Sequence, residues 1–187
     1  MSAGKARMTA HAGIIAAVYG VLTLVMIQNP LGYGPVQFRL SEAVTVVACL
    51  TSAAVPGLWL GAVIANSFMI AQLGALALFD VVLGSSATLV GAWWTWRHRE
   101  RPLVALAGPV VANAIIVPAY LPIMLKGLGL YTVPFLGIDL EGAWIPMYLF
   151  GMVTVGIGQA VVVYGLGLPL LRVLQRLGIG GMTERDR

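Results

Sequence analysis

The sequence has very little charge for its length. Of its 187 residues, only 10% are Asp, Glu, Lys or Arg, whereas 59% are hydrophobic. A soluble domain carries roughly 25% charged residues, because its surface faces water. The composition therefore excludes a soluble enzyme, a disordered chain and a secreted disulfide-rich domain. It indicates a protein whose solvent is lipid.

Residues that support catalytic or metal chemistry are also scarce. The single cysteine, Cys49, excludes an internal disulfide. No His, Cys and Asp spacing of a metal site occurs, and no serine is accompanied by a plausible base. The phosphate-binding pattern G-x-x-x-x-G-K-[ST] is missing as well. We therefore expect no cofactor and no enzymatic activity in this chain, and any ATPase must be a partner chain.

Long apolar runs make up most of the sequence. A membrane-spanning helix needs about 20 mostly apolar residues, and breakers and charges divide the chain into such runs. We expect an all-α integral membrane protein with six transmembrane helices in a single domain over residues 1–187. The spans are predicted at about 12–29, 41–54, 56–73, 80–96, 102–125 and 145–172.

The charge distribution supports six spans rather than five. A turn at Pro56-Gly57 puts three basic clusters on one side, namely the N-terminus, Arg97 to Arg101 and the C-terminal tail. Cytoplasmic loops collect Lys and Arg. We therefore expect both termini in the cytoplasm and a multi-pass protein of the bacterial cytoplasmic (inner) membrane. The N-terminal run lacks a small-residue cleavage pattern, so we interpret it as the retained first span.

Polar side chains concentrate in the predicted outer half of the bundle. Ionisable and amide groups at membrane depth are costly and suggest a functional site. A channel would have polar groups along the whole pore, so a one-sided cup favours capture of a small molecule from outside. The candidate ligand-binding residues are Arg39, Glu42, Asn66, Asp80, Asn113, Tyr120, Trp144, Tyr148 and Gln159.

Each candidate also has a purely structural interpretation. Arg39 and Glu42 are three residues apart and can pair on one helix, and Asp80 can cap a helix. The three amides can form hydrogen bonds between helices, and the aromatic residues can belong to an interfacial belt. On the first span, Ala12, Ala16 and Gly20 form a small-residue face. That face either packs within the bundle or approaches a partner helix.

Three blocks of the sequence form a recognisable pattern. They are Gly34-Pro35-Val36-Gln37-Phe38-Arg39-Leu40-Ser41-Glu42-Ala43, then Pro56-Gly57-Leu58 with Gly61 and Ile64-Ala65-Asn66, then Asp80-Val81-Val82-Leu83-Gly84-Ser85 with Ala87-Thr88-Leu89. Together these blocks resemble the QueT family. The resemblance implies the substrate-binding subunit (S component) of an energy-coupling-factor (ECF) transporter. Such subunits dock on a membrane scaffold subunit and two cytoplasmic ATPases and topple in the membrane as ATP is used.

The implied ligand is a queuosine precursor, a 7-deazaguanine such as queuine or preQ1, its aminomethyl precursor. Glu42 or Asp80 would accept from the guanine-like edge, an amide would read the carbonyl, and Tyr120, Trp144 or Tyr148 would stack on the base. Arg39 would orient Glu42 or donate to the carbonyl. Ala12, Ala16 and Gly20 would face the scaffold. The alternatives are an S component for another vitamin-like molecule, a membrane-embedded enzyme, and an assembly subunit without a ligand.

Overall fold

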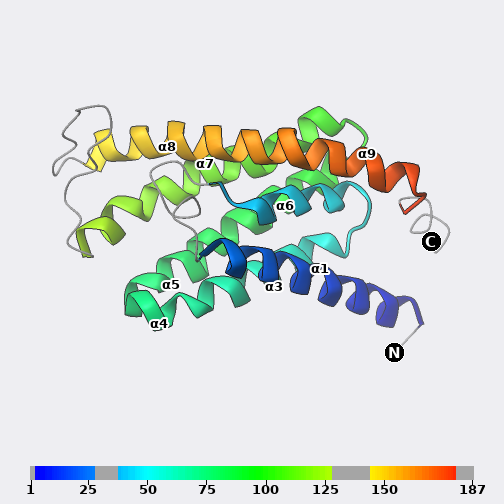
Figure 1. Cartoon of the computed structure of the whole chain (residues 1–187), viewed down its shortest axis with the longest axis horizontal. Coiled ribbons are helices and arrows are strands. Elements are labelled where there is room, and N and C mark those ends of the chain that lie inside the picture. Colours follow the sequence, from blue (N-terminus) through cyan, green and yellow to red (C-terminus); the bar gives the residue numbers. More distant parts are fainter. Residues whose placement is uncertain (1–2, 28–37, 128–143, 180–187) are drawn as a thin grey trace.

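A computed structural model describes residues 3–27, 38–127 and 144–179, and these residues form helices and connecting turns without a strand. The helices lie side by side in an elongated bundle (Figure 1). In chain order they are α1 (Ala3–Ile27), η1 (Leu40–Cys49), α3 (Ala54–Phe68), α4 (Ile70–Leu73), η2 (Gly74–Leu76), α5 (Ala77–Phe79), η3 (Asp80–Gly84), α6 (Ser85–Arg97), α7 (Pro102–Gly127), α8 (Trp144–Ala160), η4 (Val161–Gly167) and α9 (Leu168–Arg176).

Four helical stretches are long and apolar enough to cross a membrane, which makes this a multi-pass membrane protein. They are Ala3–Met26, Ala54–Arg97, Pro102–Met124 and Trp144–Arg176. The second of these contains both the predicted third and fourth spans. It turns back on itself near Gly74, whose φ of 60° is a left-handed value that glycine tolerates. Leu58 and Ala92 consequently pack in one apolar cluster.

The predicted second span, 41–54, takes a form that the sequence did not suggest. It is the 3₁₀ helix η1, and its ten residues extend only about 20 Å at a rise of ~2 Å per residue, against about 30 Å for the hydrocarbon core. Its β-branched run, Val44 to Val47, has weak helix propensity. The structure thus gives four stretches of spanning length, and six crossings remain a prediction.

The connection between η1 and α3 lies slightly earlier than predicted. Turn hydrogen bonds occur around Thr51 to Ala54, including Ala54 N–H to the Thr51 carbonyl at 3.2 Å. Pro56 is the third residue of α3, where its missing N–H costs no helical hydrogen bond. The expected break at Pro56-Gly57 is therefore a helix start.

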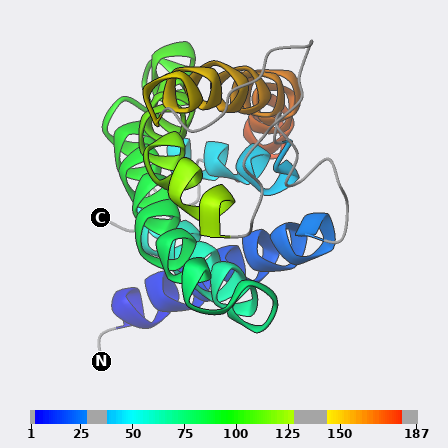
Figure 2. The same ribbon diagram turned by 90° about the vertical axis from the view of Figure 1, so that its left-hand side faces the viewer.

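η1 occupies the centre of the bundle. Its residues Ser41 to Val46 are all buried. It packs against α1, α6, α7, η4 and α9, and it lies near the middle of the bundle in the end-on view of Figure 2. Val46 packs with Leu106 of α7 and Val163 of η4 in one apolar cluster. A short, mainly apolar helix that carries the buried polar residues Ser41, Glu42 and Thr45 is thus placed among its neighbours.

Helices α1 and α3 pack closely through small residues. A Cβ added to Gly57 would lie 2.7 Å from the Ala12 carbonyl oxygen, and one added to Gly61 would lie 2.7 Å from that of Ala16. Gly20 also approaches the Gly61 carbonyl. The face of Ala12, Ala16 and Gly20, which the family resemblance assigned to the scaffold, is therefore covered by α3 within this chain. Exposed small residues of α1 include Gly13 and Ala17, on the adjacent side of the helix.

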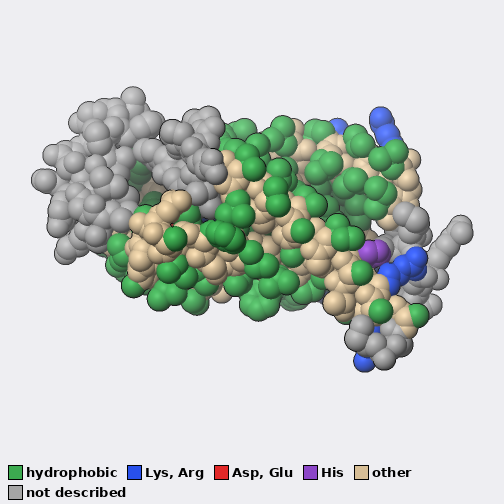
Figure 3. Space-filling view, turned by 60° about the horizontal axis from the view of Figure 1, so that its bottom comes forward, with side chains coloured by type: hydrophobic (Ala, Val, Ile, Leu, Met, Phe, Trp, Pro, Cys, Tyr) green, Lys and Arg blue, Asp and Glu red, His purple; other side chains and the backbone are tan. Residues whose placement is uncertain are grey.

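One end of the bundle is basic. The first residues of α1 and the last residues of α9 lie at the same end (Figure 1). Lys and Arg side chains gather at that end, whereas apolar side chains cover much of the length between the ends (Figure 3). Exposed residues such as Ile14, Val25, Leu103 and Ile157 belong to this apolar surface. An exposed apolar belt of this extent is typical of a lipid-facing surface.

Candidate functional site

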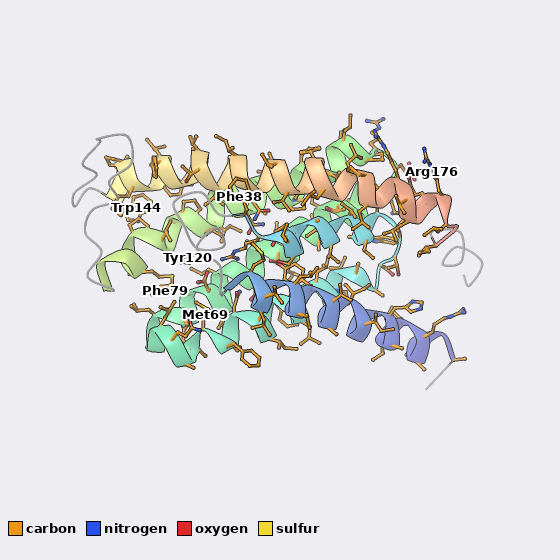
Figure 4. The ribbon with its side chains drawn as sticks, in the orientation of Figure 1. Phe38, Met69, Phe79, Tyr120, Trp144 and Arg176 are labelled. Atoms are coloured by element: carbon orange, nitrogen blue, oxygen red, sulfur yellow. The ribbon has the colours of Figure 1, made fainter. Side chains whose placement is uncertain are left out.

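Most of the predicted ligand-binding residues are buried in the bundle. Of the nine, seven are less than 9% exposed: Arg39, Glu42, Asn66, Asp80, Asn113, Tyr120 and Gln159. They come from the segment before η1, from η1 itself and from α3, η3, α7 and α8. Figure 4 places Tyr120 away from Arg176, toward the end opposite the basic one. Polar groups far apart in sequence are therefore collected inside an otherwise apolar protein.

One part of this collection, which we call the Asp80 network, consists of Arg39, Asn66, Asp80, Ser85 and Tyr120. The Tyr120 hydroxyl donates to Asp80 Oδ1 at 2.5 Å, and Arg39 Nη2 lies 3.9 Å from the same oxygen. Asn66 Nδ2 donates to the Asp80 carbonyl oxygen at 2.8 Å and to Ser85 Oγ at 3.1 Å. The network joins α3, η3, α6 and α7 with Arg39, which directly precedes η1.

The local backbone makes room for the Asp80 network. Asp80 to Gly84 form a π-helical turn, a feature that is frequent at functional sites. A Cβ on Gly84 would lie 3.0 Å from the Tyr120 hydroxyl and 3.2 Å from Asp80 Oδ1. Glycine at this position therefore lets the tyrosine and the aspartate meet beside the helix.

A second part, which we call the Glu42 layer, consists of Tyr19, Ser41, Glu42, Thr88, Asn113 and Gln159. The Tyr19 hydroxyl donates to Glu42 Oε1 at 2.5 Å and lies 3.5 Å from Thr88 Oγ1. Asn113 Nδ2 donates to the Pro109 carbonyl one turn earlier in α7, at 2.9 Å. These residues come from α1, η1, α6, α7 and α8.

Hydrogen bonding differs between the two parts. Within the described residues, the buried side-chain oxygens without a partner are Ser41 Oγ, Glu42 Oε2, Asn113 Oδ1 and Gln159 Oε1. All four belong to the Glu42 layer, and none to the Asp80 network. A buried polar atom without a partner costs roughly 1–3 kcal/mol, so most such atoms in folded proteins bond to an ordered water, an ion or a bound molecule. The four atoms are therefore candidates for contact with a ligand.

The three predicted aromatic residues occupy two different environments. Tyr120 is buried and its ring stacks on Phe79 at 6.1 Å between centroids. Trp144 is 47% exposed and stacks on Tyr148 at 5.1 Å, and its Nε1 donates to the Ala119 carbonyl at 3.2 Å. Tyr120 therefore belongs to the buried site, whereas Trp144 and Tyr148 form a partly exposed pair at the start of α8.

Sequence reasoning missed four hydroxyl residues of the site: Tyr19, Ser41, Ser85 and Thr88. Hydroxyl groups are inexpensive in transmembrane helices because they bond back to their own helix, as Thr88 does to the Gly84 carbonyl. Tyr19 was the detectable one, since its phenol lies well inside the first apolar run, far from either expected interface. In the part of the chain that the structure describes, no group of three or more His, Cys, Asp or Glu could hold a metal ion.

Comparisons with known proteins agree with these features. The family model described as "QueT transporter" matches residues 9–176. A curated relative, the queuosine precursor transporter QueT of Lactococcus lactis subsp. cremoris (strain MG1363), is 31% identical over 77 residues. That match covers 41% of this chain and 42% of the relative, which is less than half the length of each. No solved structure matches the chain.

Proposed function

The chain belongs to the QueT transporter family, and from that premise we propose that it is the substrate-capture subunit (S component) of an ECF importer for a queuosine precursor. The observation that carries the proposal is the burial of Glu42, with Oε2 unpaired, among polar residues from five helical segments. A membrane protein maintains such a group at a cost in stability. Binding of a polar ligand captured from outside would offset that cost.

The proposed ligand is a 7-deazaguanine, such as queuine or preQ1. A guanine-like edge presents adjacent N–H groups, which a carboxylate can accept. Glu42 and the amide oxygens of Asn113 and Gln159 supply acceptors of this kind. The buried Tyr120 ring and the partly buried Phe79 ring supply flat apolar surface near the same end of the bundle. The relative named a queuosine precursor transporter points to the same class of ligand.

The proposed orientation puts the basic end in the cytoplasm of a bacterial inner membrane. Lys5, Arg7, Arg97 to Arg101, Arg172 and Arg176 lie at the helix ends that Figure 1 groups together, and cytoplasmic segments are enriched in Lys and Arg. With α1, η1, α3, α6, α7 and α8 to α9 each counted as a crossing, both termini fall on that side. The buried polar residues then lie toward the external face.

The proposed partners are a membrane scaffold subunit and two cytoplasmic ATPases, because the sequence has no phosphate-binding motif of its own. ATP hydrolysis in those partners would drive toppling of this subunit, which carries the ligand inward. Since α3 covers Ala12, Ala16 and Gly20, we place the scaffold contact on the exposed side of α1 that carries Gly13 and Ala17.

The function is tested by measuring binding of queuine, preQ1 and guanine to the purified protein in detergent by isothermal titration calorimetry. We expect submicromolar affinity for a deazapurine and much weaker binding in Glu42→Gln. Glu100→Gln is the matched control, because Glu100 is exposed in the turn between α6 and α7, and it should bind like the native protein. Failure of all three compounds to bind would refute the queuosine-precursor assignment and favour another vitamin-like ligand or an assembly role.

A further inference from the structure

The unpaired oxygens of the Glu42 layer lie at one level of the bundle, between two apolar clusters. The cluster nearer the basic end contains Leu106 and Val163, with Val110 packed against it. The cluster nearer the other end contains Val117, Tyr120 and Val155. A side chain that lies between these clusters and points inward can therefore contact mainly the other polar groups of the Glu42 layer.

Asn113 and Gln159 both lie in that position. On α7, the residues Leu106, Val110, Asn113, Val117 and Tyr120 follow the spacing of one helix face. On α8 and η4, the residues Val155, Gln159 and Val163 do the same. Each amide is thus flanked by one residue from each cluster, and both amides are at most 2% exposed.

Packing between the helices brings Glu42 to the same level. Gly91 packs on Pro109, and Gly84 packs beside the Tyr120 hydroxyl, so Asn113 is level with Thr88 on the neighbouring antiparallel helix. Thr88 is linked through the Tyr19 hydroxyl to Glu42. Gly156 packs on Ala114, which puts Gln159 about 3 Å along the bundle from Asn113, at 1.5 Å per residue.

The unpaired atoms share one chemical character. Glu42 Oε2, Asn113 Oδ1 and Gln159 Oε1 are acceptor oxygens, and the Asn113 amide is oriented by its bond to the Pro109 carbonyl. The Ser41 hydroxyl is the member that can also donate. This inference rests on the proposed function. We infer that Glu42 Oε2, Asn113 Oδ1 and Gln159 Oε1 select ligands that carry N–H donors, and that Glu42 accepts a hydrogen bond from an exocyclic amine of the ligand. Asp80 is a positioning residue that does not contact the ligand.

The role of Asp80 follows from its contacts. Its Oδ1 accepts from Tyr120 and faces Arg39, and its backbone carbonyl accepts from Asn66. These bonds tie η3 to α3 and α7, and they hold Arg39 at the entrance to η1, three residues before Glu42. Asp80 therefore fixes the position of η1, and with it the direction in which Glu42 points.

The inference is tested with preQ1 and its analogue that lacks the 2-amino group, each titrated into the full-length protein. Native protein should bind the analogue about 10- to 100-fold more weakly, the usual effect of leaving a buried charged acceptor unpaired. In Glu42→Gln, and in Glu42→Asp, whose carboxylate is retracted by one methylene, this ratio should fall toward one. In Asp80→Asn both ligands should bind more weakly while the ratio persists. Glu100→Gln should leave both affinities unchanged.

Several results would overturn the inference. One is a ratio that survives both Glu42 variants, and another is a ratio that disappears in Asp80→Asn. If native protein binds preQ1 and the analogue equally well, the three acceptor oxygens do not select ligands by their N–H donors, although the capture function stands. If native protein binds neither compound nor any other deazapurine, the proposed function fails, and the inference fails with it. Thermal unfolding of each variant without ligand shows whether lost binding reflects lost folding.

Discussion

The Asp80 network and the Glu42 layer are built from the same residue types but differ in how completely they are bonded. Each contains a serine, at least one side-chain amide, and a carboxylate. In each, the carboxylate accepts a hydrogen bond from a tyrosine at 2.5 Å. In the Asp80 network the amide and the serine bond to each other and to the backbone. In the Glu42 layer the serine hydroxyl and both amide oxygens are unpaired. The difference separates a part that holds helices together from a part that is prepared to bind something else.

This comparison predicts opposite effects of matched substitutions on the stability of the ligand-free protein. Removing a paired group leaves its partners buried without a bond, which is destabilising. Removing an unpaired group relieves a cost that only a ligand offsets. The pairs below are ordered by the size of the expected difference.

The two carboxylates should differ most. Asp80→Leu removes the acceptor of Tyr120 and the carboxylate beside Arg39, so we expect a loss of about 2–4 kcal/mol in the free energy of unfolding. Glu42→Met removes a carboxylate that has one unpaired oxygen, so we expect a change within about 1 kcal/mol, or a gain. Denaturant or thermal unfolding in detergent without ligand measures both. Equal losses in the two variants would contradict the comparison.

The two amides should differ next. Asn66→Leu breaks the bonds to the Asp80 carbonyl and to Ser85, and we expect a loss of about 1–3 kcal/mol. Gln159→Met replaces an amide whose oxygen has no partner by an apolar chain of similar length, and we expect stability to stay equal or to rise by up to about 1 kcal/mol. The same Gln159→Met protein should bind preQ1 roughly 10-fold more weakly. A variant that loses stability but keeps full affinity would reverse the assignment of Gln159.

The two tyrosines test the hydrogen bond between Tyr19 and Glu42 in the Glu42 layer. Tyr19→Phe leaves both oxygens of Glu42 unpaired, so we expect a loss of about 1–3 kcal/mol in the ligand-free protein. Adding Glu42→Met should recover most of that loss, because the buried carboxylate is then gone. Tyr120→Phe with the same Glu42→Met should show simple additivity. Comparison of the two double variants by thermal unfolding decides whether Tyr19 acts through Glu42.

The two serines should give the smallest difference. Ser85→Ala removes an acceptor of Asn66, and we expect a loss of about 1 kcal/mol. Ser41→Ala removes a hydroxyl without a partner in the described structure, and we expect a change within about 0.5 kcal/mol. Thermal unfolding of both variants, measured side by side, is the check. A larger loss in Ser41→Ala than in Ser85→Ala would show that the Ser41 hydroxyl is already bonded in the free protein.

The sequence predicted which polar residues lie inside the bundle better than it predicted how they are bonded. Charge and hydropathy alone indicated a helical membrane protein, and the cost of polar groups at membrane depth pointed to seven residues that the structure buries. The same reasoning could not separate Asp80 from Glu42, because their bonding depends on how each helix is rotated. It also missed Tyr19 and Thr88, since hydroxyl groups give a weak signal in apolar helices.

Two features of the fold depended on tertiary packing rather than on pattern. Hydrophobicity suggested a full span over 41–54, but the β-branched η1 is a short 3₁₀ helix that its neighbours enclose. The small residues of α1 were compatible with an internal or an external partner. The internal partner is α3, because its Gly57 and Gly61 have no side chain and allow the α1 backbone to approach closely.

The interlock between α1 and α3 has a mechanical consequence. Because Gly57 and Gly61 lie against the carbonyls of Ala12 and Ala16 with no space for a side chain, we expect the two helices to tilt together as one unit. The end of α3 in this unit carries Asn66, which is bonded to the Asp80 carbonyl. A force applied to the exposed side of α1 by a membrane partner would therefore be transmitted to η3, the turn at Asp80 that sets the position of Glu42.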